Sequence, residues 1–285
     1  MIPAEFDYVR PATAAEAVTA VTDAGEDAKL MAGGQSLIPM LRLRLSYPST
    51  VVDVSRVEEM RGVRDDGDAL VIGAMTTHDE ILRDALIKEH APLIAQATQT
   101  VADPQVRHRG TFGGALAHAD PAGDLGAVAL TLGCEFLAQG TEGRRSIAAS
   151  DFFDDYLTTA LTPDEVLVGV RVPKLGAGWS SHYEKFNRVA QAWSIVAVAA
   201  LVRRENGSIA EARIGLTNMA STPLRAAAVE SALAGVDLTP DAVGAAAAHA
   251  AEGSNAPSDL SGAADYREHL ARVLTKRAVL AAAGS

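Results

Sequence analysis

The chain of 285 residues contains a single cysteine, Cys134, and this scarcity excludes several kinds of redox site. One cysteine cannot form an intrachain disulfide, and it cannot supply the thiolate cage of an iron–sulfur cluster or a structural zinc ion. Cys134 lies in the apolar run from Leu132 to Leu137, which indicates a small buried side chain rather than a reactive nucleophile. Any redox chemistry of this protein therefore depends on a group that it binds.

Long hydrophobic runs are also missing. The longest, Ile195 to Val202, is far shorter than the roughly 20 residues that cross a bilayer. The N-terminus carries Glu5 and Asp7 and lacks the basic-then-apolar pattern of a secretory signal. We therefore expect a cytoplasmic protein that does not span a membrane and is at most peripheral to one.

Positive charge is in deficit, because 25 Lys and Arg face 36 Asp and Glu, for a net charge of −11. Such a field repels a polyanion, so we expect no binding to nucleic acid. A single anionic cofactor is compatible with it, because backbone N–H groups and a helix terminus bind a diphosphate locally. Glycine fingerprints of the Rossmann and P-loop types and the G-x-S-x-G elbow of serine hydrolases are absent, which argues against those three classes.

The first part of the chain alternates between strand and helix signals. Strand, helix, strand, helix and strand follow one another over about residues 6–54, which predicts a small α/β unit. Thr13 with Glu16 and Thr77 with Glu80 have capping-box spacing and mark two helix starts. Further strands are predicted at 69–74, 134–138 and 166–172, and helices at 79–83 and 91–101.

The second part of the chain has a different order of elements, with strands first and helices after them. Residues 173–178 combine one proline with two glycines and form a candidate linker. Asn206 and Gly207 mark a hairpin turn between two apolar runs. We expect a small C-terminal domain of three antiparallel strands, at 181–186, 194–202 and 209–216, backed by helices at 223–234, 240–251 and 265–283.

The segment from Lys29 to Leu37 is the first candidate site. A strand runs into Gly33 and Gly34, and a helix then opens at Ser36, which could cap it. Glycine allows a tight turn and leaves the N–H groups open to a bulky anion, and the positive helix end suits a diphosphate. A plain strand–turn–helix connection is the alternative.

The stretch from Asp103 to Leu125 is the second candidate site. It is dense in Gly, His, Asp and Pro, as a ligand-lining loop is. Thr111 could donate to a phosphate, and Asp124 could accept from sugar hydroxyls. His118 with two nearby aspartates offers a metal site as the alternative, but their spacing fits no standard ligand pattern, and we predict no metal.

Together these motifs resemble those of the FAD-binding medium subunits of the molybdenum hydroxylases, the xanthine dehydrogenase family. Within that family the resemblance is strongest to the medium subunits of aerobic carbon monoxide dehydrogenases. It rests on Ala32 to Leu37 together with Thr111 to Gly114. Supporting matches lie at 72–77, 105–107, 165–167, 183–185 and 188–198, so the resemblance covers nearly the whole chain.

The resemblance implies an α+β fold. Residues 1–175 would form an FAD-binding domain of the vanillyl-alcohol-oxidase (PCMH) type in two lobes, 1–56 and 57–175, and residues 179–285 a small C-terminal domain. The diphosphate would lie on the first glycine segment, the polyol chain on Asp124, the flavin ring near Leu167 and Lys185, and the adenine beside Val101 and Ala102. The implied cofactor-binding residues are Lys29, Leu30, Met31, Ala32, Gly33, Gly34, Gln35, Ser36, Leu37, Thr76, His78, Val101, Ala102, Thr111, Gly113, Gly114, His118, Asp124, Leu167, Lys185 and Trp193.

Two positions depart from the family pattern. Ala115 stands where relatives commonly have Asn or Asp, so one polar contact to FAD is missing or is supplied by His118. Residues 188–193 lack the Gly-Asp pair that often precedes the aromatic residue of this region. Trp193 would shield the flavin, and a place in the protein core is the alternative.

The resemblance also implies a function. The chain would pass electrons from [2Fe–2S] clusters of a small subunit through FAD to an external acceptor such as a quinone. A large subunit would carry the molybdenum site, which in carbon monoxide dehydrogenase converts CO and water to CO2, and the complex would be a dimer of heterotrimers. The chain then needs no catalytic residue of its own, because FAD performs the redox chemistry. The alternatives are the same subunit of an aromatic or purine hydroxylase or an aldehyde oxidoreductase, a stand-alone FAD oxidoreductase, and a scaffold without cofactor.

Overall fold

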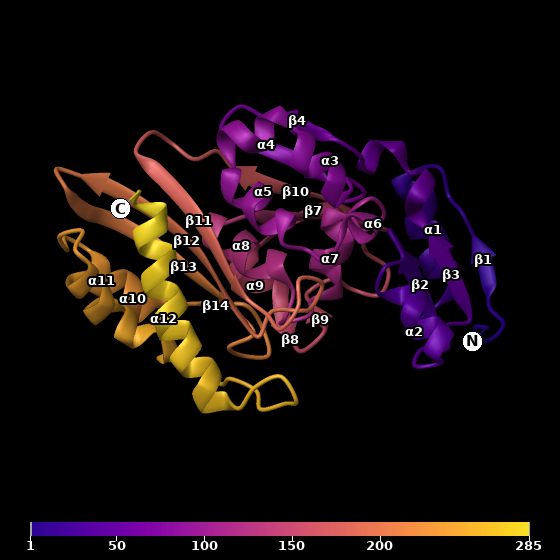
Figure 1. Ribbon diagram of the computed structural model, residues 1–285. Coiled ribbons are helices and arrows are strands. Elements are labelled where there is room, and N and C mark those ends of the chain that lie inside the picture. The colour runs from indigo at the N-terminus through magenta and orange to yellow at the C-terminus, as the bar shows by residue number, and fades with distance from the viewer. Residues whose placement is uncertain (1, 285) are drawn as a thin grey trace.

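The computed structural model describes residues 2–284, which form two α/β layers and a C-terminal sheet with its own helices (Figure 1). The N-terminal layer is a parallel sheet of order β1-β3-β2, and it confirms the predicted β-α-β-α-β unit. Thr13 caps its first helix by accepting the N–H of Glu16. The elements are β1 (Asp7–Val9), α1 (Ala14–Ala24), β2 (Ala28–Met31), α2 (Leu37–Leu43) and β3 (Thr50–Asp53).

The second layer is an antiparallel five-stranded sheet of order β4-β5-β10-β6-β7. Its strands are β4 (Val63–Asp65), β5 (Ala69–Gly73), β6 (Glu135–Gly140), β7 (Gly143–Ala148) and β10 (Val166–Pro173). Its helices are α3 (His78–Arg83), α4 (Ala85–His90), α5 (Pro92–Gln99), α6 (Pro104–Arg107), α7 (Phe112–His118), α8 (Asp124–Leu132) and α9 (Ala149–Phe152), and a hairpin of β8 (Phe153–Asp155) and β9 (Thr158–Thr159) follows. Thr77 and Glu80 form the predicted capping box at the start of α3.

The C-terminal sheet has the order β11-β12-β13-β14 and is antiparallel. Its long strands are β11 (Trp179–Phe186), β12 (Val196–Glu205) and β13 (Ser208–Thr217), and its helices are α10 (Ala227–Leu233), α11 (Pro240–Ala247) and α12 (Ala264–Ala282). The sequence predicted three strands, but a fourth, β14 (Leu224–Arg225), occupies the start of the predicted helix 223–234 and pairs with β13. Within residues 2–284, no helix combines the length and the apolar character that crossing a membrane requires.

Strand β12 joins the two halves of the molecule. Ala197, Ala199 and Leu201 face the core of the two N-terminal layers, whereas Val198 and its alternate neighbours face the core under α10, α11 and α12. Successive side chains of a strand point to opposite faces, so a strand buried on both sides reads as a continuous apolar run. The long hydrophobic run of the sequence is therefore a central strand shared by two cores.

Cys134 lies in the hydrophobic core of the N-terminal layers. Its side chain is 1% exposed, and burial raises the pKa of its thiol, with neighbouring Glu135 acting in the same direction. The thiol therefore stays protonated and unreactive. The prediction of a small buried side chain is confirmed.

Candidate cofactor-binding site

The two glycine-rich segments lie in direct contact. A Cβ added to Gly33 would lie 2.0 Å from the carbonyl oxygen of Arg109, and one added to Gly114 would lie 3.3 Å from the Cβ of Ala32. The sequence predicted that Gly33 leaves room for an anion, but its missing side chain instead lets two protein backbones touch. This contact holds residues about 80 positions apart in one site.

The turn between β2 and α2 presents unused hydrogen-bond donors. Gly34 has φ +72, a conformation that favours glycine, and the chain then enters α2 at Leu37. No backbone or side-chain acceptor within residues 2–284 binds the N–H groups of Gly34, Gln35, Ser36 and Leu37. Consecutive N–H groups of this kind form a concave anion site, so the turn fits a diphosphate.

Ser36 does not cap α2, contrary to the prediction. Its backbone is already helical, with φ −99 and ψ −49, and its side chain makes no capping hydrogen bond. A capping residue needs an extended backbone to bring its oxygen over the first helical turn. The hydroxyl of Ser36 is therefore left available beside the free N–H groups.

The start of α7 uses its donors within the protein. Thr111 is the N-cap, and its hydroxyl oxygen accepts the N–H of Gly114 at 3.1 Å. The N–H groups of Phe112 and Gly113 donate to the carbonyls of Thr76 and Ala74, both at 2.9 Å. Of the predicted donors here, the hydroxyl proton of Thr111 is the one left for a ligand.

Two further predicted residues are buried beneath this contact. Thr76 is 1% exposed, and its hydroxyl donates to the carbonyl of Gly62 at 3.1 Å, so that donor is already used. His78 is 3% exposed, its ring packs against Gly110, and its Nδ1 atom has no partner within residues 2–284. Burial lowers the pKa of His78 to about 4, and Arg107 acts in the same direction, so the ring is neutral at pH 7.

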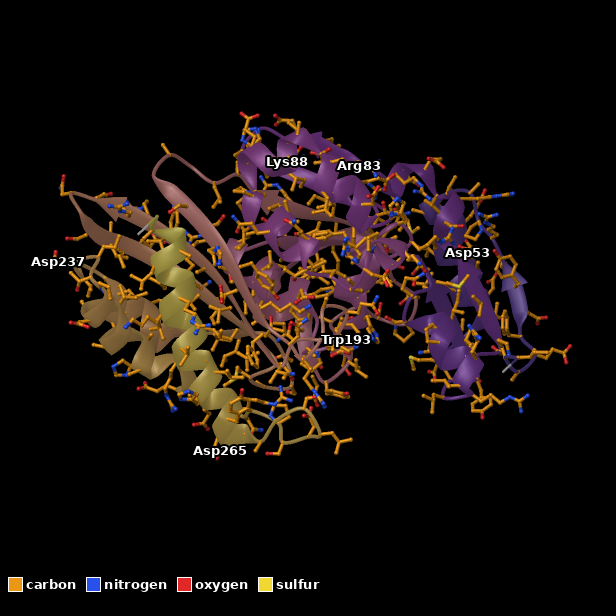
Figure 2. The ribbon with its side chains drawn as sticks, viewed as in Figure 1. Asp53, Arg83, Lys88, Trp193, Asp237 and Asp265 are labelled. Atoms are coloured by element: carbon orange, nitrogen blue, oxygen red, sulfur yellow. The ribbon has the colours of Figure 1, made fainter. Side chains whose placement is uncertain are left out.

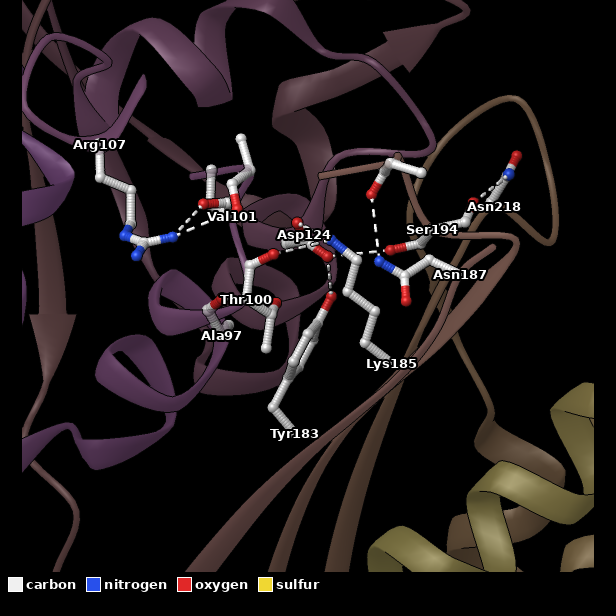
Figure 3. Close-up of polar contacts among 12 residues, drawn as sticks. Ala97, Thr100, Val101, Arg107, Asp124, Tyr183, Lys185, Asn187, Ser194 and Asn218 are labelled. Atoms are coloured by element: carbon white, nitrogen blue, oxygen red, sulfur yellow. Dashed lines mark hydrogen bonds and ion pairs between the residues drawn. The ribbon is translucent and has the colours of Figure 1, made fainter. Parts of the chain in front are cut away.

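Asp124 stands at the centre of a buried polar network (Figure 3). Its Oδ1 atom accepts from the Tyr183 hydroxyl at 2.8 Å and the Ser194 hydroxyl at 2.9 Å. Its Oδ2 atom accepts from the Lys185 ammonium at 2.8 Å, and Lys185 also donates to the carbonyl of Thr100 at 3.1 Å. A carboxylate offers about four acceptor positions, so these three donors leave room for one sugar hydroxyl.

The network is almost completely buried. The Lys185 and Asp124 side chains are 5% and 4% exposed. Burial, followed by the charge of Asp124, raises the pKa of Tyr183 well above its ordinary value, so its hydroxyl keeps its proton and donates. Tyr183 and Ser194 were not among the predicted site residues, because their link to Asp124 spans about sixty to seventy positions.

Trp193 is exposed beside the network. Its side chain is 55% exposed, so the alternative of a core tryptophan is wrong, and Figure 2 shows it on the lower side of the molecule. The chain after it is fixed, because the Asn218 amide donates to the carbonyl of Ser194 at 2.8 Å and the Arg267 guanidinium donates to that of Ile195. The indole ring of Trp193 is therefore exposed, on a segment whose backbone is held in place by these hydrogen bonds.

The other predicted residues have simpler surroundings. The carbonyls of Val101 and Ala102 accept from Arg107 at 2.7 and 3.3 Å, so this turn is braced. Leu167 is 5% exposed and lies in β10 at an irregularity of its pairing with β6, whereas Lys29 is exposed. His118 lies 4.0 Å from Asp120, and residues 2–284 hold no group of three His, Cys, Asp or Glu arranged for a metal.

Two protein families match the chain. Residues 4–175 match the family described as FAD binding domain in molybdopterin dehydrogenase. Residues 181–282 match the family described as CO dehydrogenase flavoprotein C-terminal domain. Together they cover almost the whole chain.

Whole proteins match over the same length. The carbon monoxide dehydrogenase medium chain of Hydrogenophaga pseudoflava is 40% identical over 99% of this chain and 98% of its own. That of Afipia carboxidovorans is 39% identical over 98% of this chain and 97% of its own. A solved structure of the Hydrogenophaga pseudoflava carbon monoxide dehydrogenase superposes with a TM-score of 0.97 at 42% identity, covering 100% of this chain and 99% of the other.

Proposed function

Because the chain belongs to the family of FAD-binding medium subunits of the molybdenum hydroxylases, we propose that it serves an aerobic carbon monoxide dehydrogenase. It is an oxidoreductase subunit, and its cofactor is FAD. The observation that supports carbon monoxide as the substrate of the whole complex is the 40% identity, over nearly full length, to a carbon monoxide dehydrogenase medium chain. The substrate itself would react on the large subunit.

The residues of this chain bind and orient the cofactor. The free N–H groups of residues 34–37 hold the diphosphate, with the Ser36 and Thr111 hydroxyls beside them. Asp124 would accept one hydroxyl of the polyol chain, while Lys185 holds its carboxylate in place. Held by these residues, FAD would supply the redox chemistry that exchanges single electrons with iron–sulfur clusters and electron pairs with an acceptor. We assign FAD to residues 1–175, with residues 179–285 closing the site through Tyr183, Lys185 and Trp193.

The other steps of the electron-transfer pathway take place outside this chain. A small subunit with [2Fe–2S] clusters delivers electrons, a large subunit carries the molybdenum site, and a quinone removes the electrons. We place this complex, a dimer of heterotrimers, in the cytoplasm and at most peripheral to the membrane. No residue of this chain acts as a catalytic acid or base, because no proton transfer to substrate takes place on it.

Purification from the native host without dissociating partners tests the proposal. We expect flavin absorption in the visible spectrum, with iron and molybdenum in two co-purifying chains, and dye reduction that depends on CO. A complex with the same metals that oxidises an aldehyde or a purine but not CO would contradict the substrate. Flavin on a free chain that reacts with its own electron donor would contradict the subunit role.

A further inference from the structure

The segment after the diphosphate turn exposes large apolar side chains. Ile38, Leu43, Leu45 and Tyr47 are 41%, 62%, 69% and 66% exposed, within ten residues of one another. We call these side chains, together with Arg42 and Arg44, the α2 patch. Single exposed hydrophobic residues are common on monomers, but clustered ones mark binding surfaces.

The α2 patch also differs in charge from the rest of the chain. Residues 28–52 contain Lys29, Arg42 and Arg44 and no Asp or Glu, although the whole chain has a net charge of −11. Neither arginine of the patch has an ion pair or a side-chain hydrogen bond within residues 2–284. The two guanidinium groups therefore lack the acidic partners that most arginines of this protein have.

The position of the patch links it to the cofactor. Helix α2 begins at Leu37, the last of the free N–H donors, so the patch is the outer continuation of the diphosphate turn. Figure 1 shows α2 at the lower edge of the N-terminal part of the molecule. A partner that covers α2 would thus border the cofactor site.

We propose that the α2 patch binds the iron–sulfur subunit through an acidic, partly apolar surface on that subunit. The inference rests on the proposed function, in which electrons reach FAD from that subunit. Tyr and Arg are enriched at the buried centre of an interface, whereas Lys is depleted there, and the exposed Ile and Leu side chains add apolar area that a partner would bury. Two unpaired arginines in an acid-free segment select an acidic partner and repel a second copy of this positively charged patch.

Charge reversal in the co-expressed complex tests the inference. Arg42→Glu with Arg44→Glu should weaken retention of the iron–sulfur subunit by the tagged chain about tenfold or more, and more salt should weaken the wild-type complex. Lys88→Glu with Arg277→Glu is the matched control, because both residues are exposed and unpaired, and Figure 2 shows Lys88 on the upper side. Unchanged retention by the Arg42 and Arg44 variant would overturn the inference.

Cross-linking identifies the occupant directly. The only native cysteine is buried, so Leu45→Cys carries a photo-reactive maleimide at one defined site, and Lys88→Cys carries it in the control. We expect Leu45→Cys to cross-link to the iron–sulfur subunit and Lys88→Cys not to do so. Cross-linking of Leu45→Cys to the large subunit, to a second copy of this chain or to nothing would overturn the inference.

Failure of the inference and failure of the proposed function give different results. If wild-type chain retains no iron- and molybdenum-containing subunits, the proposed function fails. If wild-type chain retains them and both α2 patch experiments match their controls, only the docking surface is wrong. An unchanged urea midpoint of each variant shows that loss of retention does not reflect unfolding.

Discussion

Gly33 lies where a side chain would collide with the carbonyl of Arg109 at 2.0 Å. Gly33→Val should force the two glycine segments apart, move the four N–H donors, and lower the flavin-to-protein ratio of the purified complex about tenfold. Gly176→Val is the matched control, because a Cβ there meets nothing within 4 Å. A full flavin complement in Gly33→Val would refute the assignment of the diphosphate to this turn.

His78 makes stability depend on pH, because it stays neutral in the folded state. Unfolded His78 takes up a proton near pH 6.5, whereas burial keeps the folded pKa at about 4. Stability is therefore lost as the pH falls from the unfolded to the folded pKa, by about 3 kcal/mol in total for this residue. His78→Phe should flatten this part of the pH profile, measured by urea unfolding at several pH values; an equally steep loss in the variant would exclude His78 as its source.

At the scale of elements, the Asp124–Lys185 pair joins α8 to β11. Asp124→Asn leaves the Lys185 ammonium buried without its counter-charge, which should cost about 3 kcal/mol of unfolding free energy. Asp124→Asn combined with Lys185→Met should cost less than the sum of the single changes. Glu268→Gln, in the half-exposed pair with Arg272, should change stability by less than about 1 kcal/mol. Urea denaturation measures all four variants, and additive losses at 124 and 185 would contradict a coupled pair.

Elements with a local signal could be predicted from the sequence. The box of Thr77 and Glu80 and the turn at Asn206 and Gly207, with φ +52 and +88, occur where their spacing and residue types required them. Edge strands β4 and β7 have mostly exposed side chains and therefore no apolar alternation to reveal them. The sequence predicts no helix at α8 and assigns only its first residues to the glycine-rich stretch, because α8 is buried on nearly all sides and shows no polar face.

The residues of the site also divide into those that a sequence motif indicates and those that no local signal indicates. The glycine turn, Thr111 and Asp124 stand in motifs, so their role could be proposed from residue type and spacing. Ser194 and Asn218 carry no such signal, because their roles come from contacts between distant parts of the chain. The Ser194 hydroxyl donates to Asp124, and the Asn218 amide holds the backbone that follows Trp193. Only tertiary structure reveals residues of that kind.

The whole molecule should unfold as one unit, because β12 is central to both cores. Removing residues 179–285 would expose the apolar face that packs on Ala197, Ala199 and Leu201, and the separate C-terminal part would expose the same side chains. We expect urea transitions followed by far-UV circular dichroism and by fluorescence to coincide. Both tryptophans, Trp179 and Trp193, lie in the C-terminal part, so an earlier fluorescence transition would show independent unfolding.

The most direct test of the central claim is anaerobic addition of CO to the purified complex while the flavin absorption is followed. If this chain is the flavoprotein subunit of a carbon monoxide dehydrogenase, CO bleaches the flavin band, and a quinone added afterwards restores it. If CO reduces the iron–sulfur clusters but leaves the flavin oxidised, while a chemical reductant bleaches it, the flavin of this chain does not lie on the path of the electrons.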